Sequence, residues 1–63
     1  MCLSTVYKNV MEPASIVMKT VTAIECRDGK VIITDLMDRQ VEIIGTLECA
    51  HLIDGYVIVK ETE

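Results

Sequence analysis

The apolar residues of the chain occur in short runs that turn-forming residues separate. Within several runs apolar and polar positions alternate, which is the pattern of a β-strand with one face towards a core. No run shows the longer period of a convincing helix. The pattern predicts strands over residues 4–8, 18–27, 31–34, 40–43, 46–52 and 56–60.

The first run illustrates how this alternation assigns the two faces of a strand. Leu3, Thr5 and Tyr7 are expected on one face, and Ser4 and Val6 on the other, because successive side chains of a strand point to opposite sides. The alternation therefore predicts which residues of the first strand share a face.

Two Asp-Gly pairs give the clearest turn signals. Asp28-Gly29 lies between two strand-like runs, and a type I′ turn needs positive φ at both central residues, which this pair adopts readily. Asp54-Gly55 repeats the signal before the last run. The only proline lies in the segment 9–15, which is therefore predicted to be a turn or loop.

The segment 46–52 fits two interpretations. Leu47, Ala50 and the pair His51-Leu52 could form a helical turn or a bulged strand, and we favour the strand. Gly45, just before this segment, is expected to break or bend the chain. The expected fold is all-β, a small barrel of five to six short antiparallel strands.

Length and composition limit the organisation of the molecule. The 63 residues suffice for one small domain, residues 1–63, but bury only about 60% of the unfolded surface. Apolar residues make up 51% of the chain, so we expect a second copy to cover part of them. A tightly packed monomer with an apolar surface patch is the alternative.

Charge and cysteine content exclude several classes of partner. The net charge is −4, and the six basic residues are scattered singly, whereas nucleic-acid phosphates require clustered lysine and arginine. No apolar run reaches the 18 or so residues that span a bilayer, and no signal peptide is evident. Neither nucleic acid nor a membrane is expected as a partner.

The cysteine content indicates the cellular compartment. Three cysteines, an odd number, fit the reducing cytoplasm.

Position 2 carries the most distinctive chemistry. Cys2 follows Met1, and a small second residue normally lets the initiator methionine be removed. Cys2 would then offer its thiolate, its α-amino group and the backbone amide of Leu3 as chelating donors. Ni(II) and Cu(II) favour square-planar, nitrogen-rich sites, and thiolate strengthens the binding of such ions. The alternative is that Cys2 is only a small residue before a strand.

The residues from Met1 to Tyr7, Met-Cys-Leu-Ser-Thr-Val-Tyr, resemble the start of the CooT-type family of small nickel-binding proteins. The Asp28-Gly29 hairpin, the Ile33-Thr34-Asp35-Leu36 segment and the short apolar last strand support the resemblance. It implies an SH3-like barrel, a homodimer, Ni(II) held through Cys2, and nickel delivery to carbon monoxide dehydrogenase. The HypC-type maturation chaperones also begin Met-Cys and use a small β-barrel, so hydrogenase assembly is the neighbouring role.

The expected function is therefore that of a nickel-binding accessory protein or metallochaperone, with a metal site at Cys2 and Leu3. One alternative is a metal-free adaptor for metalloenzyme assembly. A small RNA-binding domain is a third reading, which the acidic charge opposes. No enzyme is expected, because the single histidine has no evident catalytic partner and no catalytic motif is present.

The remaining candidate residues have simpler interpretations. Cys26 and Cys49 are expected to pack in the core, as free cysteines usually do. Cys49 and His51 would share a strand face and could form a second metal site, but a lone Cys-x-His lacks the other ligands of a zinc site. Asp35 and Asp38 flank a turn, where carboxylates commonly bind backbone N–H groups.

Overall fold

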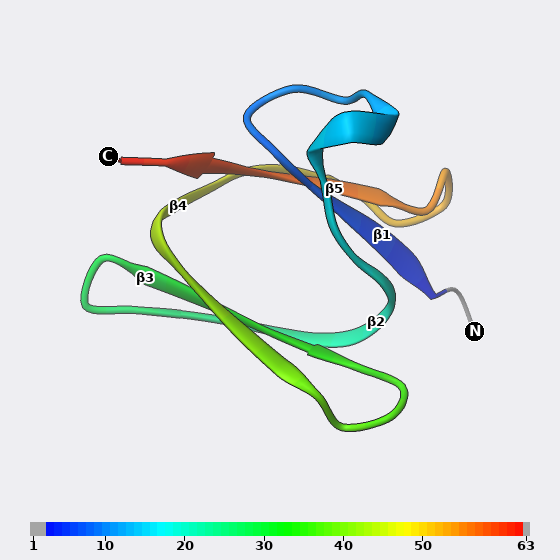
Figure 1. Ribbon diagram of the computed structural model, residues 1–63, viewed down its shortest axis with the longest axis horizontal. Helices are drawn as coiled ribbons and strands as arrows, with labels where there is room; N and C mark the ends of the chain where they lie inside the picture. Colours follow the sequence, from blue (N-terminus) through cyan, green and yellow to red (C-terminus); the bar gives the residue numbers. More distant parts are fainter. Residues whose placement is uncertain (1–2, 63) are drawn as a thin grey trace.

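The computed structural model describes residues 3–62, which form a closed barrel of five strands (Figure 1). The elements in chain order are β1 (Ser4–Lys8), η1 (Pro13–Ser15), β2 (Ile16–Arg27), β3 (Lys30–Asp35), β4 (Gln40–His51) and β5 (Tyr56–Glu61). Apart from the short 3-10 helix η1, residues 3–62 contain no helix. The expectation of an all-β barrel with five to six strands is confirmed.

The strands follow one another around the barrel in chain order. Successive strands pair antiparallel, whereas β1 and β5 close the ring in parallel. The parallel pair follows from the number of strands: when an odd number of strands runs alternately up and down, the first and last run in the same direction. Four pairs thus match the antiparallel expectation and the closing pair does not.

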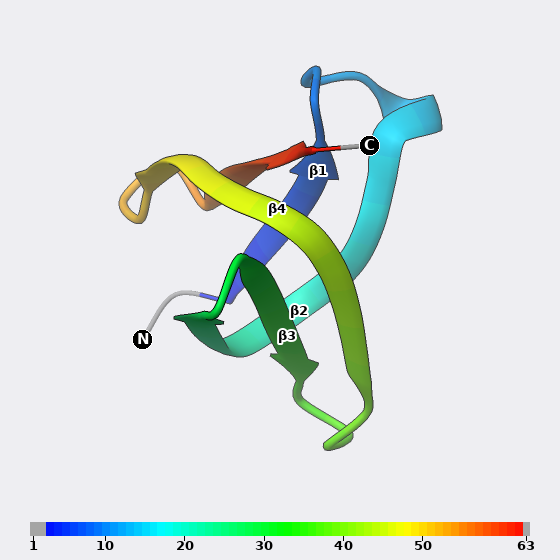
Figure 2. The same ribbon diagram turned by 90° about the vertical axis from the view of Figure 1, so that its left-hand side faces the viewer.

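The two longest strands each pair with two different strands along their length. The first half of β2 pairs with β1 and its second half with β3. Likewise, β4 pairs with β3 up to residue 44 and with β5 from residue 45. Figure 2 shows β2 and β4 curving around the barrel, so that each turns from one partner strand to the next. Bends in long strands of this kind form the corners of small barrels.

Seven buried aliphatic side chains from all five strands form the core. They are Val6, Val21, Val31, Ile33, Ile43, Val57 and Val59. Ser4 and Val6 are both buried, which agrees with the prediction that they share a face, and the structure shows that this is the inward one. Aliphatic burial of this kind is the main stabilising contribution to a domain that lacks tryptophan and phenylalanine.

Both Asp-Gly turns occur in hairpins. Asp28 and Gly29 have φ values of 51° and 75°, so both adopt the left-handed conformation expected of a type I′ turn. The second hairpin has a longer loop, residues 52–55, between β4 and β5. It is closed by the Gly55 N–H, which donates to the His51 carbonyl at 2.8 Å.

Gly45 bends β4 without interrupting it. The strand continues from Gln40 to His51 as one element, and Gly45 lies where its partner changes from β3 to β5. A Cβ atom at this position would lie 2.9 Å from the Glu61 Cα and would collide with the Lys60 carbonyl oxygen. The glycine is therefore required by the close approach of the β5 backbone.

Cys26 is exposed, so the prediction that it packs in the core is wrong. It pairs with Val31 of β3, but the pairing of β1 with β2 ends at Val21. The second half of β2 consequently has a strand on one side only, and this leaves Cys26 uncovered. Cys49 is half-buried on β4 and does not belong to the core cluster.

Candidate functional site at the N-terminal end of the barrel

Cys2, the principal predicted metal ligand, lies outside the described residues. Leu3 is the first residue that the structure describes, and the residue is 37% exposed. Strand pairing of β1 begins at Ser4 on one side and at Thr5 on the other. The backbone amide of Leu3 therefore lies before the paired part of the strand, at the surface of the barrel.

Backbone hydrogen bonds attach this end of β1 to the hairpin that follows β4. The Thr5 N–H donates to the Gly55 carbonyl at 2.9 Å, and the Gly55 N–H donates in turn to His51. Gly55 has a positive φ of 83°, a backbone conformation that glycine adopts readily. In this conformation its carbonyl accepts from Thr5 while its N–H donates to His51. The start of β1 and the β4–β5 hairpin accordingly lie at the same end of the molecule in both views (Figures 1 and 2).

His51 lies on this hairpin and stacks on Tyr56, with ring centroids 4.5 Å apart and an angle of 16° between the ring planes. The two residues are opposite each other in the β4–β5 pair. Sequence reasoning did not identify this contact, although opposite positions at the end of a hairpin are a signal for it.

The second predicted metal site is not assembled within the described part of the chain. Cys49 and His51 occupy alternate positions on β4, opposite Ile58 and Tyr56, so they share a face as predicted. However, residues 3–62 contain no group of three or more His, Cys, Asp or Glu side chains that could hold a metal ion. The pair therefore remains without further ligands among these residues.

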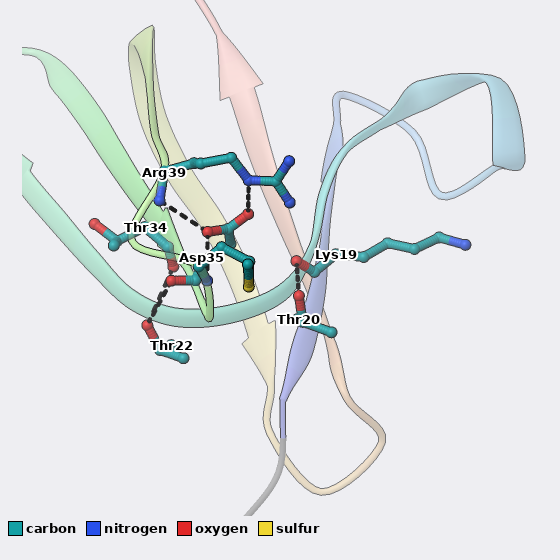
Figure 3. Close-up of polar contacts among 7 residues, drawn as sticks. Lys19, Thr20, Thr22, Thr34, Asp35 and Arg39 are labelled. Carbon is teal, nitrogen blue, oxygen red and sulfur yellow. Dashed lines mark hydrogen bonds and ion pairs between the residues drawn. The ribbon is translucent and has the colours of Figure 1, made fainter.

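Asp35, the last residue of β3, stabilises the turn that leads to β4 (Figure 3). It does so by accepting hydrogen bonds from backbone N–H groups of the turn, as the sequence predicts. The carboxylate is buried, and its Oδ1 atom accepts hydrogen bonds from the backbone N–H groups of Met37 and Arg39, each at 2.9 Å. Its Oδ2 atom accepts from the Arg39 Nε at 2.8 Å. These bonds, led by the one from the Arg39 N–H, lower the pKa of Asp35 because they favour the ionised carboxylate.

Asp38, the other carboxylate at this turn, adopts a left-handed conformation with φ of 66°, which aspartate tolerates better than most residues. Both aspartates thus serve the turn between β3 and β4. The described surroundings give neither of them a metal-binding or acid-base role.

The comparisons with known proteins identify one family. A sequence model of the family described as "CO dehydrogenase accessory protein CooT" matches residues 1–60, which include the described barrel up to Lys60 and the Met1-Cys2-Leu3 start. No curated protein matches the chain. Within the described residues, no helix is long and apolar enough to cross a membrane.

Proposed function

The chain belongs to the family of the CO dehydrogenase accessory protein CooT, and from this premise we propose that it binds Ni(II) through Cys2 and the backbone of Leu3. The single observation that carries the proposal is that the family match begins at residue 1 and so includes the Met-Cys-Leu start. An accessory role towards carbon monoxide dehydrogenase follows from the family. We assign the chain a nickel-holding part in that role and no catalytic step.

The chemistry of the donors supports nickel as the cargo. After removal of Met1, the thiolate and α-amino group of Cys2 form a five-membered chelate, and the deprotonated amide of Leu3 can add a third donor. Ni(II) prefers such planar, nitrogen-containing sites. Because Leu3 is exposed and precedes the paired part of β1, nickel can reach its amide without opening the barrel.

A homodimer would complete the coordination by bringing two Cys2 residues to one nickel ion. The outer face of β1 and β5 is a suitable contact surface, since Tyr7 and Ile58 are opposite each other there and half-buried, and Leu3 is exposed just before β1. Apolar residues on an outer sheet face favour association. The free thiols of Cys26 and Cys49 fit a cytoplasmic location.

The test is a nickel titration of the trimmed, reduced protein, followed by thiolate-to-nickel charge-transfer absorption. We expect a band that saturates at a fixed stoichiometry. Cys2→Ser should abolish the band, whereas Cys26→Ser should leave it unchanged. Cys26 is the matched control because its thiol is also exposed but has no adjacent terminal amine.

A protein that retains Met1 provides the second control. Its Cys2 nitrogen is part of a peptide bond, so the chelate is lost and the affinity for nickel should fall strongly. An unchanged spectrum after nickel addition to trimmed, reduced protein would refute the proposal and favour a metal-free adaptor for metalloenzyme assembly.

A further inference from the structure

The ring of strands is closed, but parts of β2 and β4 are unpaired along one edge, and an opening lies between these edges. Residues 22–27 of β2 pair with β3 and not with β1, and residues 45–51 of β4 pair with β5 and not with β3. Each segment therefore presents one edge without a strand partner among residues 3–62. A hydrogen bond of 2.9 Å from the Gly45 N–H to the Gly29 carbonyl closes one end of the opening.

The opening is an apolar groove. Its wall on β2 includes Ala23, Ile24 and Cys26, and its wall on β4 includes Leu47 and Ala50. The loop after β4 adds Leu52 and Ile53, which are 62% and 95% exposed. No charged side chain lines it. An exposed groove of this character is typical of a surface that binds another polypeptide.

Two acidic residues directly follow residues that line this groove in the chain, Glu48 after Leu47 and Asp54 after Ile53. Glu48 and Asp54 are exposed and form no ion pair with any residue between 3 and 62. On the β2 side, Glu25 is already paired with Arg27 at 3.1 Å. The unpaired carboxylates favour a partner with positive charges beside its apolar part. A second copy packed groove against groove would instead bring like charges together.

We propose that this groove binds an extended peptide segment of a partner protein, with an apolar core and flanking lysine or arginine residues. The segment adds as a strand to a free edge of β2 or β4, where backbone hydrogen bonds give affinity and the apolar walls accept alternate side chains. Its basic flanks face Glu48 and Asp54. This inference does not rest on nickel binding, since Leu3 does not line the groove and the experiment below uses no nickel.

The experiment uses a synthetic peptide of alternating valine and threonine, as long as the segment 22–27, with two lysines at each end. It is added to the ¹⁵N-labelled full chain and followed by NMR. We expect amide shifts confined to residues 22–27 and 45–55, and slower thiol alkylation of Cys26. Replacing the lysines by glutamates should abolish the shifts. Glu48→Gln combined with Asp54→Asn should weaken binding by about threefold or more.

Two arginine variants test whether the peptide binds in this groove. Ala23 is exposed in the groove, so Ala23→Arg should block the peptide without disturbing the core. Ile44, which is exposed outside this groove, provides the matched control, and Ile44→Arg should bind normally. Equal binding by both variants, or shifts spread over the outer face of β1 and β5, would overturn the proposal. Protection of Cys26 that rises with protein concentration alone would show a second copy in the groove and would also overturn it.

Discussion

The substitution Gly45→Ala should destabilise the barrel far more than an ordinary glycine substitution in a strand. The β5 backbone passes directly over residue 45, and an added Cβ would lie 2.9 Å from the Glu61 Cα and 3.0 Å from the Lys60 carbonyl carbon. Carbon atoms normally approach to about 3.5 Å. Since these neighbours are backbone atoms, no side-chain rotation can relieve the overlap, and β4 and β5 must separate.

The separation has two energetic consequences. Overpacking of this kind costs about 1–3 kcal/mol, and the strand movement weakens the 2.9 Å hydrogen bonds from the Gly45 N–H to Gly29 and from the Thr62 N–H to Ile44, each worth about 1 kcal/mol. We therefore expect a loss of about 3 kcal/mol. For a chain of 63 residues the whole free energy of unfolding is about 3–9 kcal/mol, so much of the stability is removed.

Urea unfolding followed by far-UV circular dichroism measures this loss. Gly29→Ala is the control, because a Cβ at Gly29 meets nothing within 4 Å and only its φ of 75° opposes alanine, at about 1 kcal/mol. With an m value of about 1 kcal/mol per molar urea, the midpoint should fall by about 3 M for Gly45→Ala and about 1 M for the control. Equal losses in the two variants would refute the role assigned to Gly45.

Three further predictions concern single side chains. The lowered pKa of Asp35 means that its contribution to stability is present above the ordinary value of 3.8 and is lost as the pH falls through the lower pKa of the folded protein. Asp35→Asn should therefore make unfolding less dependent on pH in this acid range, and an unchanged pH profile by circular dichroism would contradict the assignment. Thr20 is a β-branched residue with φ of 52°, so Thr20→Gly should raise the free energy of unfolding by about 0.5–1 kcal/mol; a lower melting temperature would count against this strain. Cys26→Ser should change stability by less than about 0.5 kcal/mol, because the thiol is exposed; a large loss in urea unfolding would show that Cys26 is buried after all.

Local features of the fold could be predicted from the sequence. Asp28-Gly29 specifies its hairpin through backbone conformation alone, and the alternation in the first strand places Ser4 and Val6 on the same face of β1. Both signals depend only on neighbouring residues. The turn role of Asp35 was predictable for the same reason, since its hydrogen bonds reach no further than Arg39.

Features that depend on contacts between distant strands could not be predicted in this way. Cys26 is exposed because the pairing of β1 with β2 ends at Val21. The alternation of apolar and polar residues does not specify how far two strands stay paired. The role of Gly45 depends on the approach of β5, which a local pattern cannot reveal. The groove likewise exists because β2 and β4 each change partner halfway along.

The central claim, that the chain holds nickel through a terminal Cys2, is tested most directly by the mass of the intact protein under native conditions with and without Ni(II). We predict a species without Met1 that gains nickel as a homodimer, with one ion shared by two chains, and a Cys2→Ser variant that gains none. A trimmed, reduced wild-type protein whose mass is unchanged by nickel would contradict the account.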